Sequence, residues 1–319
     1  MNDDVTFAEK IHKRFPEGLT GLFAVGGTRT AYILEVNRND PEPGRIKDFA
    51  GYSTYGFEHT LAMIATFLKL GGQNAIISAL SFRSYFERGP EYAQLVTPEL
   101  ERMIDHEATG FYRQHDIDPY FVGIDTLLTF PEDNGAHQVA RRLTEFQENW
   151  SYAPERRKLI WEIASLPLFS LWQALENGTE EERQSLRHQI ENATGLQELH
   201  TVLYQHCSRK ILGTDLPHPH FYLGTNKSGD LKVRSPLMVA LTAGEYLRLY
   251  YTPYPSFFVT QDAMQAILED VAFNERFHAD NTDYRGQFTP ELAQEEYDRV
   301  IKLSSDPNAI LGYARRIVT

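Results

Sequence analysis

The sequence contains a single cysteine, Cys207, among 319 residues. One thiol excludes an internal disulfide framework and a zinc site built from several cysteines. No apolar run approaches the roughly 20 residues that a membrane-spanning helix needs. Residues 1–14 carry scattered charges where a secretory signal would carry an apolar stretch. We therefore expect a cytoplasmic protein without a membrane span.

An excess of positive charge is also missing. The chain has 31 lysines and arginines against 44 aspartates and glutamates, which gives a net charge of −13. A field of that sign repels polyanions, so nucleic acid is not an expected partner. The chain also has no Walker loop, no Gly-x-Gly-x-x-Gly fingerprint at its first strand and no Gly-x-Ser-x-Gly elbow. A small anionic ligand stays compatible with the sequence where basic side chains gather locally.

The most informative stretch that is present lies near the start of the chain. The apolar run Leu22–Val25 predicts a buried strand, and it breaks at once into Gly26-Gly27-Thr28-Arg29. Two glycines allow a sharp turn and a close approach to a ligand. Exposed main-chain N–H groups there can bind an anion, with a hydroxyl from Thr28 and a fixed charge from Arg29. We interpret the turn as a phosphate or diphosphate site at the carboxyl end of a parallel strand. The alternative is an ordinary Gly-Gly turn with a solvated arginine, and the local sequence does not separate the two.

Strand and helix signals alternate along the chain, which is typical of a parallel sheet. Further strands are predicted at 75–77, 120–122, 221–223 and 249–251, and helices at 55–70, 98–114, 139–150, 236–246, after 260 and at 290–303. Between them, residues from about 150 to 207 read as a helical insertion. Its helices are expected at 154–175, ended or kinked by Pro167, at 180–192 behind a Thr179–Glu182 capping box, and at 196–207. The chain 1–319 is thus expected to be one α/β domain with this insertion.

Two further groups of side chains are candidates for the site. Four late cations would close over a diphosphate if the end of a late strand lies beside the first one: Lys227, Lys232, Arg234 and Arg248. The alternative is a solvated polar loop, which we favour for both lysines. Six aromatic residues flank the ends of the first two strands: Tyr52, Tyr55, Phe82, Tyr85, Phe86 and Tyr92. Aromatic faces stabilise cations by about 0.5–2 kcal/mol each, so such a pocket suits a carbocation, although plain core packing explains any single one. A metal site formed by His206, Cys207, His218 and His220 fits no strong zinc spacing.

The order and spacing of these motifs resemble the cis-prenyltransferase superfamily. A strand followed by Gly-Gly-Thr-Arg is similar to its Asp-Gly-x-Arg-Arg phosphate loop. Glu87-Arg88-Gly89-x-x-Tyr92 resembles the segment after its second strand, and residues 246–260 resemble its Leu-Tyr-Phe-Thr stretch. The likeness is strongest to the terpene-synthase branch, which includes tuberculosinol, tuberculosinyl adenosine and kolavelool synthases. It covers most of the chain outside the helical insertion.

The resemblance implies a six-stranded parallel sheet flanked by helices, with a hydrophobic tunnel for a prenyl-type diphosphate and its head at the loop. Arg29 matches a diphosphate-binding arginine, and Tyr92 matches a pocket tyrosine near the reacting carbon. Tyr52, or else Tyr55, matches a second pocket tyrosine, and Arg234 falls within about a position of an arginine that grips diphosphate. The expected substrate-binding set is Gly26, Gly27, Thr28, Arg29, Thr30, Tyr55, Phe82, Arg234 and Arg248. A homodimer is implied as well.

The chain departs from the family pattern at three places. Gly26 stands at the loop aspartate, Thr30 at the second loop arginine, and Arg248 at a late glutamate that helps to bind magnesium in chain-elongating enzymes. These changes argue against chain elongation. Magnesium is expected as a cofactor with no assigned ligands, and Glu35 and Asp125 are acids near strand ends that would substitute.

The resemblance leads to one main hypothesis about function. It implies a diterpene synthase that ionises a bicyclic diterpenyl diphosphate, such as kolavenyl diphosphate. Water would capture the allylic cation to give a tertiary alcohol, such as kolavelool, plus diphosphate, with Arg29, Tyr52 and Tyr92 as catalytic residues. One alternative is prenyl transfer to a nucleoside. Another is a non-catalytic partner subunit of a cis-prenyltransferase, which the missing loop aspartate would fit.

Overall fold

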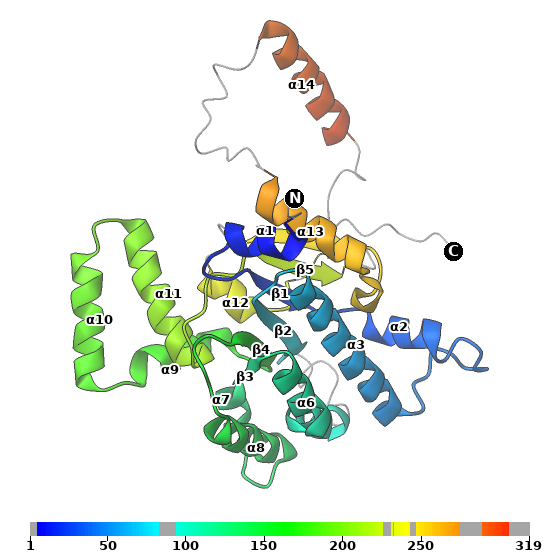
Figure 1. Cartoon of the computed structure of the whole chain (residues 1–319), viewed down its shortest axis with the longest axis vertical. Helices are drawn as coiled ribbons and strands as arrows, with labels where there is room; N and C mark the ends of the chain where they lie inside the picture. Colours follow the sequence, from blue (N-terminus) through cyan, green and yellow to red (C-terminus); the bar gives the residue numbers. More distant parts are fainter. Residues whose placement is uncertain are drawn as a thin grey trace.

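A single sheet of six strands forms the centre of the computed structural model, which describes residues 5–82, 94–225, 231, 233–242, 247–274 and 289–305. The strand order is β3-β4-β2-β1-β5-β6, and all five neighbouring pairs are parallel. The strands are β1 (Thr20–Ala24), β2 (Asn74–Leu80), β3 (Ile117–Val122), β4 (Arg157–Ile163), β5 (Phe221–Thr225) and β6 (Arg248–Thr252). This α/β architecture, with helices around the sheet, confirms the expected fold class (Figure 1).

Strand β1 lies at the centre of the sheet, between β2 and β5. All five of its residues are buried. Leu22 and Ala24 belong to the core on one face, and Phe23 belongs to the core on the other. A parallel strand covered on both faces has a continuous apolar sequence, which is why the run at Leu22 was recognisable.

Helices cover the two faces unequally. The larger core lies under α1 (Phe7–Arg14), α3 (Phe49–Lys69), η1 (Pro98–Ile104), α6 (His106–Gln114), α7 (Ile124–Leu127), α8 (Gly135–Asn149) and α13 (Gln261–Phe273). The second core lies under α9 (Pro167–Glu176), α11 (Leu196–Leu212) and α12 (Pro236–Leu241). A small aromatic cluster joins α2 (Thr28–Glu35) to α3 and η2 (Ser256–Phe258). The described side chains of α10 (Glu180–Asn192) and α14 (Pro290–Ser304) include none that is buried, and both helices project from the body in Figure 1.

The predicted helix over 154–175 is wrong. Strand β4 occupies Arg157–Ile163 and lies between β2 and β3 in the sheet. Its run Leu159–Ile163 is wholly buried, and a short apolar run of that kind fits a buried strand and a buried helix equally well. Pro167 begins α9 instead of ending a helix, because proline is well tolerated in a first turn. The helical part of the 150–207 segment therefore starts at Pro167, and its status as an insertion stays a prediction.

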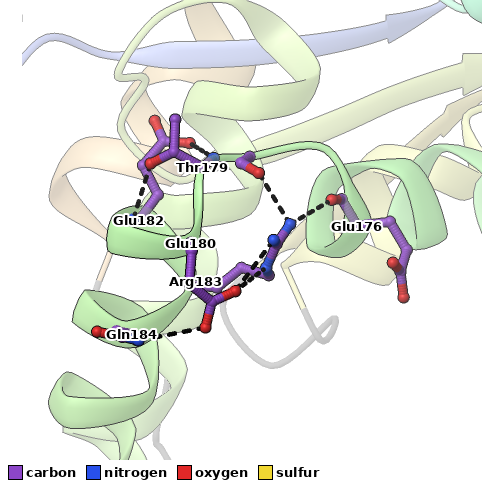
Figure 2. Close-up of polar contacts among 7 residues, drawn as sticks. Glu176, Thr179, Glu180, Glu182, Arg183 and Gln184 are labelled. Atoms are coloured by element: carbon purple, nitrogen blue, oxygen red, sulfur yellow. Dashed lines mark hydrogen bonds and ion pairs between the residues drawn. The ribbon is translucent and has the colours of Figure 1, made fainter.

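The corner between α9 and α10 confirms the predicted capping box. The Thr179 hydroxyl accepts a hydrogen bond from the Glu182 N–H (3.2 Å), and the Glu182 carboxylate accepts one from the Thr179 N–H (3.0 Å). Arg183 donates to the Glu180 carboxylate and to the carbonyl oxygen of Glu176 (Figure 2). These bonds satisfy N–H groups that the helix itself cannot pair, so α10 begins at a fixed residue.

Two predicted boundaries moved for local reasons. Helix α3 begins at Phe49, six residues before the predicted start at Tyr55, because the Asp48 carboxylate caps it through the Gly51 N–H (2.9 Å). The predicted helix over 98–114 is divided at Asp105, which caps α6 through the Ala108 N–H (2.9 Å). No helix in the described ranges combines the length and the apolar character needed to cross a bilayer.

Candidate functional site

The turn after β1 leads directly into α2. Gly27 has a φ of +69°, in the left-handed region that favours glycine, and it is the N-cap of α2. No side chain caps this helix end. The first N–H groups of an α-helix have no intrahelical partner, and the helix dipole adds positive potential there. The start of α2, at the carboxyl end of the central strand, is thus suited to an anion.

Two hydroxyl side chains fix the turn to the neighbouring strands. The Gly26 N–H donates to Ser256 Oγ (3.0 Å), and the Ser256 N–H donates back to the Gly26 carbonyl oxygen (3.0 Å). Ser256 Oγ also lies 2.7 Å from Thr225 Oγ1 at the end of β5. This corrects one expectation, because the Gly26 N–H is bound within the protein. The candidate for binding an anion is therefore the start of α2, not the Gly26 N–H.

Arg234 lies against Gly26. Its Nη1 is 3.4 Å from the carbonyl oxygen of Val25. A Cβ built on Gly26 would lie 2.8 Å from Arg234 Nη1 and 3.2 Å from the Cβ of Thr225. A side chain at residue 26 would therefore require the guanidinium to shift from this place. The expectation that a late strand would end beside the first one is confirmed, since β5 pairs with β1.

The backbone of Arg234 is held by the ends of several strands. Its N–H donates to the Tyr222 hydroxyl of β5 (3.1 Å), and its carbonyl oxygen accepts from Ser78 of β2 (2.8 Å). The hydroxyl of the next residue, Ser235, donates to the carboxyl of Glu162 on β4. The residue itself stays exposed to solvent. The structure thus presents a guanidinium at the loop from a backbone anchored to β2, β4 and β5.

Glu162 is a buried acidic residue that contacts Ser235, with an exposure of 2%. Burial raises the pKa of its carboxyl, while hydrogen bonds from Ser165 (2.5 Å) and Ser235 act in the opposite direction. Sequence reasoning missed Glu162 because it assigned the segment to a helix. Its local signal is a single acid inside the apolar run Leu159–Ile163, which marks a buried carboxyl in a strand or a helix alike.

Tyrosines gather beside the start of α2. The Tyr52 hydroxyl lies 2.6 Å from Thr28 Oγ1, and Thr30 is half-buried in the same turn. Tyr32, which sequence reasoning missed, has its ring 5.4 Å from those of both Tyr52 and Tyr55. The structure therefore brings Tyr52 to the loop.

Tyr55 lies deeper in this cluster, and its hydroxyl is bound to an acid at a distance from the loop. Its hydroxyl donates to Glu35 (2.6 Å) at the far end of α2, and burial raises the pKa of the phenol. The Glu35 carboxylate is also 3.7 Å from His59 Nε2. Tyr52 is thus the better placed of the two candidate tyrosines.

The remaining predicted residues are spread more widely. Arg29 is exposed, and its Nη2 donates to the carbonyl oxygen of Gly44. Phe82 is half-buried beyond β2 and packs on the larger core. The following candidates lie outside the described residues: Tyr85, Phe86, Tyr92, Lys227 and Lys232. Cavities of about 270 and 340 Å³ lie beside Asp125 and beside Trp150, and neither of these borders the Gly26–Thr30 turn.

Arg248 does not reach the loop. It is the first residue of β6, where it donates to the carbonyl oxygens of Asp270 and Asn274. The loop lies near the other end of this strand, where Thr252 pairs with Thr225. Arg248 and Thr252 are four residue steps apart along the strand, a distance of about 13 Å at roughly 3.3 Å per residue. The prediction that Arg248 belongs to the diphosphate site is therefore wrong, because Arg248 lies at the opposite end of β6.

The acids considered for magnesium do not converge. Glu35 bonds Tyr55, whereas Asp125 lies in the first turn of α7 beyond the edge strand β3 and accepts from Ser170 (3.3 Å). Three strand spacings separate β3 from β1, about 14 Å in total. Within the described ranges, no three His, Cys, Asp or Glu side chains group as metal ligands would. Among the zinc candidates, His220 Nδ1 accepts a hydrogen bond from the Thr20 N–H (3.1 Å).

The six-stranded parallel sheet with helices around it matches the cis-prenyltransferase fold of solved structures. One solved structure that shares it is lavandulyl diphosphate synthase from Lavandula x intermedia in complex with dimethylallyl diphosphate, at 15% identity and a TM-score of 0.54. That match covers 82% of this chain and 97% of the synthase. Another is a probable undecaprenyl diphosphate synthase from Campylobacter jejuni, at 15% identity and a TM-score of 0.51, covering 81% and 97%. No protein-family model and no curated protein sequence matches the chain.

Proposed function

We propose that this chain is an enzyme that binds a prenyl-type diphosphate at the Gly26–Thr30 turn and releases its diphosphate group. The observation that carries the proposal is the pairing of an uncapped α2 N-terminus with the guanidinium of Arg234, both at the carboxyl edge of the sheet. Ligands of open α/β sheets bind at this edge, next to the central strand. The lavandulyl diphosphate synthase with this fold was crystallised with a prenyl diphosphate, which supports the choice of ligand.

The reaction proposed is that of a diterpene synthase. The carbon–oxygen bond of a bicyclic diterpenyl diphosphate, such as kolavenyl diphosphate, breaks heterolytically, and the bonding electron pair leaves with the diphosphate. Positive groups fixed around the departing oxygens stabilise the charge that develops there. The first turn of α2 and the backbone that carries the Arg234 guanidinium are held in place in this way. Arg29 is close enough along the chain to join them if its side chain leaves Gly44.

The allylic cation left behind is captured by water. Its oxygen bonds to the tertiary allylic carbon, and its proton passes to the released diphosphate, which gives an alcohol such as kolavelool. Tyr52 is the described tyrosine closest to the turn through its contact with Thr28, so we assign it the role of orienting that water. Tyr92, which the family resemblance matches to a pocket tyrosine near the reacting carbon, is proposed as a second catalytic tyrosine. Aromatic rings of this kind stabilise a nearby cation by about 0.5–2 kcal/mol each.

Two other functions share the same site. A nucleoside in place of water would make the chain a prenyl transferase. A catalytically silent subunit of a cis-prenyltransferase would keep the fold and lose the chemistry. The homodimer implied by the family resemblance stays a prediction. The magnesium that it also implied has no ligand set among the described residues.

A product assay separates these functions. Purified protein is incubated with kolavenyl diphosphate, with and without adenosine, and the organic extract is analysed by gas chromatography with mass spectrometry, while released diphosphate is measured in the aqueous phase. We expect an alcohol and one equivalent of diphosphate, and a loss of both in Arg234→Gln. Arg141→Gln, at an exposed arginine on α8, is the matched control. Unreacted substrate in every arm, across geranylgeranyl, copalyl and kolavenyl diphosphates, would refute the proposal.

A further inference from the structure

We propose that a prenyl diphosphate binds at the Gly26–Thr30 turn without a divalent cation, its charge balanced by Arg234 and by the N-terminus of α2. The inference rests on the proposed function, because it concerns the charge balance of that same site. It assigns the neutralising role to protein groups where a metal ion would otherwise be expected.

The geometry around Gly26 carries the inference. A Cβ on residue 26 would lie 2.8 Å from Arg234 Nη1, closer than real Cβ contacts come. Gly26 is also buried and bound through its N–H to Ser256, so the backbone cannot move aside without breaking that bond. A loop carboxylate at this residue would occupy the space of the guanidinium. In this chain the guanidinium of Arg234 thus lies beside the residue at which the family pattern has the loop acid.

The donor set beside Gly26 does not fit magnesium. Mg²⁺ takes octahedral oxygen ligands that usually include one or two carboxylates. In the part of the chain that the structure describes, the acid linked to this site is Glu162, which is buried and already accepts hydrogen bonds from Ser165 and Ser235. Burial raises the pKa of that carboxyl and so favours its neutral form. A magnesium ion at Gly26 would in addition face the positive charge of Arg234 at close range.

The protein groups can take over the charge balance. A guanidinium stays protonated at all working pH values and offers two parallel N–H donors to phosphate oxygens. The N-terminus of α2 adds the equivalent of about half a positive charge. The bonds of Arg234 to Tyr222 and Ser78, and of Ser235 to Glu162, hold the backbone here, so only the Arg234 side chain has to be ordered when the anion binds.

The test is a binding measurement. Isothermal titration calorimetry with geranylgeranyl thiolodiphosphate, a non-hydrolysable probe, is run in EDTA and again in Mg²⁺. We expect the wild-type dissociation constant to change less than about threefold between the two buffers. Arg234→Gln should weaken binding in EDTA by about 10- to 100-fold, the effect of losing a charge-assisted contact. Arg234→Lys should recover part of the lost affinity, because lysine keeps the positive charge but lacks the two parallel N–H donors of the guanidinium.

Gly26→Asp is the second variant, and it probes the same space from the loop. The added carboxylate would pair with the Arg234 guanidinium and repel the anion, so binding in EDTA should weaken by at least about tenfold. Far-UV circular dichroism confirms that each variant is folded, and Arg141→Gln is the matched surface control.

The outcomes separate this inference from the proposed function. Tight binding that requires Mg²⁺ and is indifferent to Arg234→Gln would overturn the inference and leave the proposed function standing. No binding of the probe in either buffer would overturn both. Binding in EDTA that Arg234→Gln and Gly26→Asp both weaken supports the metal-independent site.

Discussion

The left-handed backbone of Gly27 is the feature of the loop whose replacement gives the clearest expected effect. Gly27→Ala places an L side chain at a φ of +69°, which costs about 1–2 kcal/mol. The new Cβ would also lie 3.0 Å from the Cα of Pro255, a backbone atom that cannot rotate away. The two effects together predict a loss of about 2 kcal/mol in the free energy of unfolding, with a looser start to α2.

The chain offers a matched control for this change. Gly56 lies inside α3, and a Cβ built on it meets no atom within 4 Å. Gly56→Ala is expected to stabilise the protein by about 0.5–1 kcal/mol, because alanine is the better helix former. Urea denaturation followed by circular dichroism measures both variants against wild type. Equal effects from the two substitutions would refute the argument that the loop depends on a left-handed glycine.

Three smaller changes test other parts of the structure. Ser256→Ala removes the acceptor of the buried Gly26 N–H and should cost about 1–3 kcal/mol by thermal melting. Tyr52→Phe deletes the hydroxyl beside Thr28. We expect the rate of product formation to fall about 3- to 10-fold with little change in melting temperature. An unchanged rate would show that Tyr52 has no part in the mechanism. Burial lowers the pKa of His220 to about 4 in the folded state, whereas the unfolded chain binds this proton near pH 6.5. Protonation below pH 6.5 therefore favours the unfolded state. Stability should therefore fall by about 2 kcal/mol between pH 7.5 and pH 5, and His220→Asn should lose less over that range in urea titrations.

The sequence was sufficient to locate the loop, because its signal is local. An apolar run that ends in two glycines specifies a buried strand followed by a sharp turn, and both are present at β1 and Gly27. The capping box before α10 was predictable for the same reason, since its bonds join residues three apart. Strand β4 was not predictable from its own residues, because a run buried on both faces of a sheet carries no alternation.

The partners of the loop depend on tertiary geometry. Arg234 and Arg248 are both basic residues after or within late strands, and nothing in their local sequence distinguishes them. The structure places Arg234 against Gly26 and Arg248 at the opposite end of β6, on the carbonyl oxygens of Asp270 and Asn274. Strand direction and register make that distinction, and both follow from the whole sheet. The role of Gly26 likewise becomes apparent only when its neighbour in space is known.

A crystal structure with geranylgeranyl thiolodiphosphate, grown without divalent cations, tests the account most directly. We expect the diphosphate to lie on the first turn of α2 with its oxygens hydrogen-bonded to the guanidinium of Arg234, and the hydrocarbon to extend past Tyr52. A diphosphate bound away from this turn, with Arg234 still directed to the carbonyl oxygen of Val25, would contradict the account.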